Sequence, residues 1–427
     1  MTAPASAGVK ASVVPGHPGD ATGGDAVAPP VFASLVGQAH AIPIWRAIVA
    51  DAARARRGEV APGFTHAWLI TGPPGSGRST AALALAAALT CPAGGCARCP
   101  VCEAILTRRD PDVEIMSPVG TTQRVADTRH LIARAASAPV AHPWRLVILE
   151  DADRLNDAAA NALLRTLEEP TARTLWILCA PSAQDVLATL RSRCRTIALR
   201  TPATEAVAEL LSGQAAFSQH PPVSAEVAQF AARAAMGHVG RARALALDEG
   251  ERQRRQAVMR IPEVIGDLGE AMTAAAALIS SCTEAAAELG DQAEAAERSA
   301  ILTAHGATAD ARPRERTRAQ RSASAQLKEV TRRGKDRRRR LLTDRLDRAL
   351  LELTSFYRDV LVMHLGEPVA LVNPEQRPAI ERLAAASDLA TCQRWLDDLA
   401  RARWALTTNA APQLTVEALL VQLSNRG

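Results

Sequence analysis

Residues 66–80 read HAWLITGPPGSGRST and pass from an apolar run through a glycine-rich loop into an alanine-rich segment. The run His66–Gly72 predicts a β-strand, and Ser79–Leu89 predicts an α-helix. A glycine-rich loop that follows a strand and opens a helix is the setting in which proteins bind phosphate groups. The pattern therefore predicts an α/β domain with a phosphate-binding loop, and a plain glycine–proline turn is the alternative.

The predicted nucleotide site consists of nine consecutive loop residues. Backbone N–H groups of such a turn and the positive end of the following helix dipole attract a polyphosphate. Ser79 stands where a hydroxyl would bind Mg²⁺, and Arg78 stands where these loops usually carry lysine. A planar guanidinium does not simply replace an ammonium, so we expect ATP or ADP binding with weak or absent hydrolysis. The residues are Gly72, Pro73, Pro74, Gly75, Ser76, Gly77, Arg78, Ser79 and Thr80.

A second apolar run, Trp144–Asp151 (WRLVILED), predicts a strand that helices cover on both faces. Glu150 and Asp151 close this run. In phosphate-loop ATPases an aspartate at this place holds Mg²⁺ and a neighbouring glutamate polarises the attacking water. Here the order is glutamate, then aspartate. We interpret the pair as a degenerate Mg²⁺ site, with a purely structural role as the alternative.

Apolar runs alternate with helical segments from about Val31 to Arg200, which is typical of a parallel sheet with helices on both faces. Beyond Pro202 the pattern is helical. We expect an α/β domain over residues 31–201, a compact helical domain over 202–248 and a longer helical domain over 249–427. The other expected strands are Val113–Ser117, Leu175–Cys179 and Thr196–Leu199, and the clearest expected helices between them are Val125–Ser137 and Asn156–Glu169.

The composition is that of a globular protein, since 48% of the 427 residues are apolar and 22% are charged. Aromatic residues make up only 3%, so the core must consist largely of small aliphatic side chains. No run approaches the ~20 apolar residues that span a bilayer. Residues 1–30 contain five proline, five glycine and seven alanine residues without an apolar core, which predicts a disordered tail and a cytoplasmic location.

Four of the eight cysteines fall within twelve residues, in the segment CPAGGCARCPVC. Four thiolates in a short loop can complete the tetrahedral shell that Zn²⁺ prefers, and a filled shell indicates a structural rather than a catalytic metal. An iron–sulfur cluster is the alternative. The predicted ligands are Cys91, Cys96, Cys99 and Cys102.

Charge is distributed unevenly in the second half of the chain. Residues 263–297 contain eight acidic side chains and no basic one, whereas residues 310–345 contain fourteen basic and five acidic side chains. Solvated helix faces or a flexible insertion explain such blocks, and a nucleic-acid patch or pairing between the blocks are the alternatives. We expect a charged, partly disordered insertion at about residues 290–340.

Three further motifs resemble those of a known protein family. They are VFASLVGQ (31–38), LEDADRLNDAAANALLRTLEEP (149–170) and LATLRSRCR (187–195). Together with the phosphate loop and the cysteines, they make the chain resemble the AAA+ clamp loaders of bacterial DNA polymerase III, and among their subunits the delta-prime type. The resemblance covers most of residues 31–200. It implies an AAA+ domain, a helical lid (202–248) and a helical collar (249–427).

Such a subunit would form a five-subunit ring with the gamma/tau motor subunits and the delta subunit. The ring would load the sliding clamp on primed DNA. The resemblance also implies membership of the polymerase holoenzyme without polymerase activity in this chain.

The resemblance assigns Arg193, in Ser192-Arg193-Cys194, to the arginine finger that projects into the ATP site of a neighbouring subunit. It also identifies two missing γ-phosphate sensors. Ala180-Pro181 replaces the polar residue after the strand, and Gly240 replaces the lid arginine. Arg241 follows one position later, a rotation of about 100° on a helix. These departures imply a largely non-hydrolysing ring member that donates Arg193.

Two other functions remain open from the sequence. An ATP-hydrolysing motor subunit of the gamma/tau type would tolerate the altered loop. A zinc-dependent nucleic-acid-binding protein would use the cysteine segment and the basic block at 310–345, with an affinity that falls steeply with salt.

Overall fold

The computed structural model describes residues 29–117, 125–171, 173–213, 223–307, 313–366, 369–408 and 410–424. The tail expected over residues 1–30 lies almost entirely outside these ranges. Within the described part of the chain, no helix is both long and apolar enough to cross a membrane.

Five parallel strands form one sheet in the order β2-β3-β4-β1-β5. Every residue of β1, β3 and β4 is buried, because helices cover both faces of the sheet. The fold class expected from the sequence is therefore confirmed. The strands are β1 (Ala67–Thr71), β2 (Val113–Met116), β3 (Arg145–Leu149), β4 (Thr174–Ala180) and β5 (Arg195–Ala198).

Side chains alternate between the two faces of the sheet, as the two-residue period of a strand requires. In β1, Trp68 and Ile70 pack on one side, and Ala67 and Leu69 on the other. The first side holds η1 (Pro30–Phe32), α1 (Ile42–Arg56), α2 (Arg78–Thr90) and α3 (Pro100–Leu106). The second side holds α4 (Val125–Ala135), η2 (Ala152–Arg154), α5 (Asp157–Glu168) and α6 (Ala188–Arg191), and η3 (Ala183–Asp185) precedes α6.

Three short helices follow the sheet domain and have an alanine-rich core of their own. They are α7 (Thr204–Ser212), α8 (Ala225–Ala235) and α9 (Val239–Leu247). His238 precedes α9, and its ring nitrogen accepts the N–H of Arg241, which caps the helix at the point where it meets the phosphate loop.

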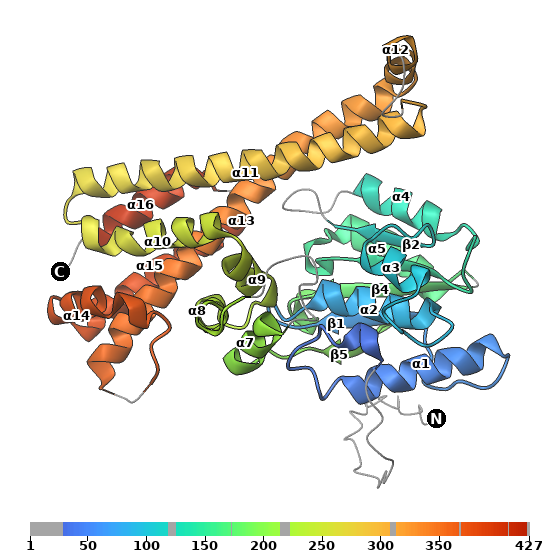
Figure 1. Ribbon diagram of the computed structural model, residues 1–427, viewed down its shortest axis with the longest axis horizontal. Coiled ribbons are helices and arrows are strands. Elements are labelled where there is room, and N and C mark those ends of the chain that lie inside the picture. The colour runs from blue at the N-terminus through green and yellow to red at the C-terminus, as the bar shows by residue number, and fades with distance from the viewer. Residues whose placement is uncertain are drawn as a thin grey trace, which may run out of the picture.

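The rest of the described chain is helical and has a separate core, in which Phe356, Tyr357 and Trp395 are fully or almost fully buried. Figure 1 shows its two longest helices, α11 and α13, as a hairpin that runs above the sheet domain to α12. The helices are α10 (Glu249–Val264), α11 (Leu268–Ala304), α12 (Pro313–Ser322), α13 (Ser324–Leu365), α14 (Arg377–Ala385), α15 (Leu389–Thr407) and α16 (Pro412–Ser424), with η5 (Pro374–Gln376) before α14.

The structure differs from the sequence prediction at the charged insertion. Residues 290–304 belong to α11 and residues 324–340 to α13, where partial disorder was expected. Ion pairs between the acidic and basic blocks explain the order. Arg338 lies 2.6 Å from Asp291 and 2.8 Å from Glu294, and Arg337 lies 2.8 Å from Glu297. The described parts of the two blocks thus follow the alternative of intramolecular charge pairing.

Candidate nucleotide site and cysteine cluster

The glycine-rich loop has the backbone shape that phosphate binding requires. Gly75 and Gly77 have φ values of 87° and 92°, which L side chains rarely adopt, and α2 begins directly afterwards at Arg78. A Cβ on Gly75 would lie 2.3 Å from Cγ of His238, and the N–H of Val239 donates to the Gly75 carbonyl at 3.3 Å. The start of α9 therefore packs directly on the loop.

A cavity of about 660 Å³ lies between the loop, η1 and the start of α9. Residues 75–80 and His238 line it, together with Arg243. The Ser76 hydroxyl is buried and has no hydrogen-bond partner among the described residues. A cavity of this size beside a helix N-terminus, with an unpartnered hydroxyl in its loop, fits a nucleotide with its phosphates on the loop.

Arg78 turns back onto its own loop. Its Nη1 donates to the Gly72 carbonyl at 3.1 Å, and its Nη2 lies 3.9 Å from Oδ1 of Asp151. The side chain is only 15% exposed. The guanidinium therefore bridges the loop and the end of β3. The sequence, in contrast, predicts that this side chain binds phosphate.

Glu150 and Asp151 lie beside the loop, as expected, but arginines hold both carboxylates. Arg108 donates to Oε1 of Glu150 at 2.8 Å, and the Ser117 hydroxyl donates to Oε2. Burial raises the pKa of Glu150, but hydrogen bonds from Ser117 and Ser79 and the charge of Arg108 outweigh burial and lower it overall.

Asp151 adopts the left-handed conformation, with φ at 52°, and binds an arginine from the far end of the sequence. Arg340 of α13 donates to Oδ2 at 2.9 Å, and Arg154 lies 3.9 Å from the same oxygen. Arg108, Ser117 and Arg340 were not predicted from the sequence. Arg340 stands 189 positions from Asp151, and no local pattern signals such a contact.

Magnesium fits these residues poorly. All four oxygens of Glu150 and Asp151 face a hydrogen-bond or ion-pair donor, and the Ser79 hydroxyl hydrogen-bonds Glu150. The groups that the sequence assigned to Mg²⁺ are thus engaged with one another and with arginines. The cavity therefore fits a nucleotide, whereas the side chains at the end of β3 do not fit a divalent cation.

Arg193 follows α6 and lies at the surface, with 35% of its side chain exposed. It donates to the Thr189 carbonyl at 2.8 Å and forms an ion pair with Glu168 at the end of α5. Both partners of this pair are partly exposed. The guanidinium is therefore held at an accessible position.

The resemblance relates two positions, Ala180 and the residue before Arg241, to missing phosphate sensors. Ala180 ends β4 with a buried side chain, and its carbonyl accepts the Gly72 N–H at 3.3 Å. Arg241 points away from the loop and donates to Glu352 of α13 at 2.6 Å, with each side chain 6% exposed. This pair joins α9 to the large helical region.

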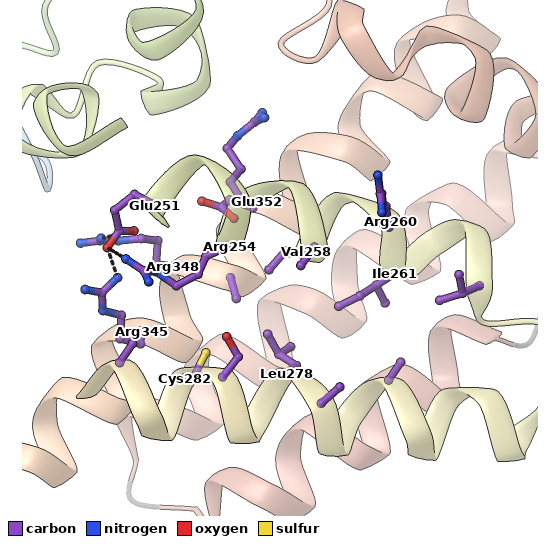
Figure 2. A pocket seen from close by; sticks show the side chains of 18 residues that line it. Glu251, Arg254, Val258, Arg260, Ile261, Leu278, Cys282, Arg345, Arg348 and Glu352 are labelled. Atoms are coloured by element: carbon purple, nitrogen blue, oxygen red, sulfur yellow. Dashed lines mark hydrogen bonds and ion pairs between the residues drawn. The ribbon is translucent and has the colours of Figure 1, made fainter. Parts of the chain in front are cut away.

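A second cavity, of about 230 Å³, lies next to that joint among α10, α11 and α13. Figure 2 shows apolar side chains such as Val258 and Leu278 on one side and a charged cluster on the other. In the cluster, Glu251 forms ion pairs with Arg345 and, at 3.8 Å, with Arg348. Because these charges pair within the chain, the cluster explains how α10 is fixed to α13.

The four predicted metal ligands lie together. The sulfur atoms of Cys91, Cys96, Cys99 and Cys102 are all within 4.8 Å of one another, and two of the Sγ–Sγ distances are 3.7 Å. Four sulfurs around Zn²⁺ at ~2.3 Å are about 3.8 Å apart, so the cluster fits this ion. Backbone hydrogen bonds, that of Arg98 above all, lower the pKa of Cys96 to about 6, which favours the thiolate that a metal binds.

The cysteine segment also supports the nucleotide cavity. The N–H of Val31 in η1 donates to the Gly95 carbonyl at 3.2 Å, and both Val31 and Ala97 line the cavity. A metal bound by the four cysteines would therefore stabilise one wall of the predicted site without taking part in a reaction.

Two segments of the chain match family models of known proteins. Residues 60–203 match the model described as DNA polymerase III, delta subunit, and residues 341–425 match the model for the C-terminal part of that subunit. The first match spans all five strands, the phosphate loop, the four cysteines and Arg193. The second spans the C-terminal half of α13 and the helices that follow.

Curated relatives agree with these models. The chain is 36% identical over 166 residues to the delta' subunit of DNA polymerase III from Escherichia coli (strain K12), which covers 36% of this chain and 48% of that protein. It is 35% identical over 158 residues to the delta' subunit from Haemophilus influenzae (35% and 47% covered). It is also 32% identical over 170 residues to the gamma/tau subunit from Mycobacterium bovis (39% and 28% covered). The chain thus spans less than half the length of these relatives.

Among solved structures, the chain overlaps with a DNA polymerase III gamma subunit-related protein from Thermotoga maritima. The sequence identity is 16%, the overlap covers 84% of this chain and 94% of that one, and the TM-score is 0.37. The RuvB Holliday junction branch migration motor from the same organism overlaps with 57% of this chain and 82% of its own, at 16% identity and a TM-score of 0.36.

Proposed function

Because the chain is a relative of the DNA polymerase III delta' subunits, we propose that it acts as a clamp-loader subunit of this type. In this role it donates Arg193 to the ATP site of a neighbouring subunit and hydrolyses little or no ATP itself. Its partners are the gamma/tau motor subunits and the delta subunit in a five-subunit ring, which places the sliding clamp on primed DNA in the cytoplasm.

The proposal rests on a difference in charge pairing between the phosphate loop and the region of Arg193. The charged groups around its own phosphate loop pair with one another, whereas Arg193 stands at the surface. The ion pair between Arg193 and Glu168 is partly exposed, and such pairs contribute only about 0–1 kcal/mol. A neighbour's triphosphate can therefore replace Glu168 as the partner of this guanidinium at little cost.

A guanidinium at the γ-phosphate offsets the charge that spreads over its oxygens in the transition state. Arg193 supplies this charge from outside the site that reacts. The chain needs no catalytic base for the task, and we expect no polymerase activity in it. Zn²⁺ at the four cysteines has a structural role, and ADP or ATP occupies the cavity beside Gly75 without efficient turnover.

The domains follow the same proposal. Residues 31–201 form the AAA+ domain, 202–248 the lid and 249–427 the collar that assembles the ring. The Arg241–Glu352 pair supports a lid that is fixed to the collar, because it removes from the nucleotide site an arginine that stands next to the missing sensor position.

The test is the ATPase rate of a reconstituted complex of gamma/tau, delta and this chain with DNA and clamp. Arg193→Ala should lower that rate by about tenfold or more, and the melting temperature of the isolated chain should not change. Arg195→Ala is the matched control, since Arg195 is an exposed arginine of the same segment whose guanidinium donates to the Gly63 carbonyl. Unchanged turnover with Arg193→Ala would refute the role.

A motor subunit is the second candidate, because gamma/tau subunits match this chain at an identity close to that of the delta' subunits. A motor predicts steady ATP hydrolysis by the isolated chain that Ser79→Ala abolishes. The self-paired Arg78 and Asp151 favour the non-hydrolysing subunit over the motor.

A further inference from the structure

Four arginines from four separate parts of the chain surround the acid pair at the end of β3. The distances from guanidinium nitrogen to carboxylate oxygen are 2.8 Å and 2.9 Å for the two closest and 3.9 Å for each of the other two. Glu150 and Asp151 are 13% and 23% exposed, so solvent screens these charges only in part. The arginines are Arg108 after α3, Arg340 of α13, Arg78 of α2 and Arg154 of η2.

The local charge opposes a divalent cation. Two further carboxylates stand nearby, namely Asp344, at 3.6 Å from Nε of Arg340, and Asp153. Even with all four carboxylates ionised, they only balance the four guanidiniums. The cluster therefore has no net negative charge in any protonation state, whereas Mg²⁺ sites use unpaired carboxylates.

The oxygens that would hold the ion or its waters are occupied as well. Arg108 and the Ser117 hydroxyl take the two oxygens of Glu150, and Arg78 and Arg340 take those of Asp151. A magnesium ion would have to displace at least one of these arginines from a partly buried carboxylate. The arginine would then face the ion without its partner, which adds repulsion to the lost contact.

We infer that the cavity binds a nucleoside di- or triphosphate in its metal-free form. Loop N–H groups and the N-terminus of α2 then offset part of the phosphate charge that Mg²⁺ neutralises in an ATPase. The inference depends on the proposed function in one respect only, namely that the cavity binds a nucleotide. Arg340 acts here as a positioning residue, because it holds Asp151 away from a metal and links the helical region to the site.

The experiment measures the Kd of ADP for the full-length, zinc-loaded chain by calorimetry, once with 5 mM MgCl₂ and once in a buffer freed of divalent cations by a chelating resin. No soluble chelator is added, so zinc stays on the cysteines, and elemental analysis of the sample checks that Mg²⁺ is absent. The expected result is that the two Kd values agree within about twofold. A Kd that rises about tenfold without Mg²⁺ would overturn the inference.

Absence of ADP binding in both buffers would also overturn it, while the turnover assay with Arg193→Ala decides the proposed function independently. The double variant Arg108→Gln/Arg340→Gln removes the closest guanidinium from each carboxylate, so ADP should bind it at least about fivefold more tightly with Mg²⁺ than without. Arg332→Gln, at an exposed arginine of α13, should behave like the parent chain. If the double variant remains indifferent to Mg²⁺, the arginines are not the cause and the inference fails.

Discussion

The buried pair Arg241–Glu352 joins α9 to α13, and we predict that substitutions at its two residues lower the stability of the chain by unequal amounts. Glu352 faces the charges of Arg241, Arg255 and Arg348, whereas Arg241 has Glu352 as its nearest carboxylate, at 2.6 Å. Glu352→Gln keeps the shape of the side chain and removes the charge that offsets three guanidiniums. Breaking a buried pair in this way costs about 3–5 kcal/mol.

Arg241→Gln should cost less, about 1–3 kcal/mol, because the remaining carboxylate keeps two arginines nearby. The double change Arg241→Met/Glu352→Leu removes both members of the pair and should therefore destabilise the chain by less than the sum of the two single changes. Stability would be followed by urea unfolding with circular dichroism at 222 nm. Glu329→Gln, in an exposed ion pair of the same helix, is the control and should leave the midpoint unchanged.

A greater destabilisation by Arg241→Gln than by Glu352→Gln would contradict this asymmetry. A double variant whose loss of stability equals the sum of the two single losses would also contradict it, because the two residues would then act independently. A coupling energy of about 2 kcal/mol or more between the two positions is the expected result.

Removal of metal by a chelator should lower the melting temperature, and Cys102→Ser should abolish zinc binding as measured by elemental analysis; a metal-free wild type with unchanged melting would exclude the structural role. Burial raises the pKa of Asp112, but three backbone N–H groups at residues 140–142 outweigh it and lower the pKa overall. Its contribution to stability is therefore present above pH ~4 and is lost as the pH falls further, so the urea midpoint of the wild type should drop more steeply below pH 4 than that of Asp112→Asn. Arg338→Ala removes contacts to two acidic residues of α11 and should speed amide hydrogen exchange at residues 285–304, whereas Arg332→Ala should not.

The sequence predicts the sheet domain well because its signals are local. The apolar run before Gly72 and the run that ends at Glu150 each satisfy the pattern of a strand covered on both faces, and both are buried strands in the structure. The cysteine cluster is equally local, since a short loop brings all four sulfurs together. In each case the residues that decide the structure lie within about twelve positions of one another.

The long helical hairpin could not be predicted in the same way. Residues 290–304 lack basic side chains up to Arg298, and the basic block begins beyond residue 310, so each block alone has the composition of a solvated or disordered segment. The helices become ordered when Arg338 meets Asp291 and Glu294, a contact between positions more than forty residues apart. Composition describes each block but not the pairing of one with the other.

The altered phosphate loop and the hairpin are connected through Asp151. In the sequence, Arg78 and the order of Glu150 and Asp151 are two separate departures from the ATPase pattern. In the structure, Arg78 and Arg340 face opposite oxygens of Asp151, so both departures belong to one charge cluster that reaches from α2 to α13. A lysine at position 78 would offer a single ammonium and could not contact Gly72 and Asp151 together as the guanidinium does. Arg78 therefore fits a site in which other side chains of the protein bind Glu150 and Asp151. Replacing Arg78 should disturb the structure of the loop rather than a catalytic step.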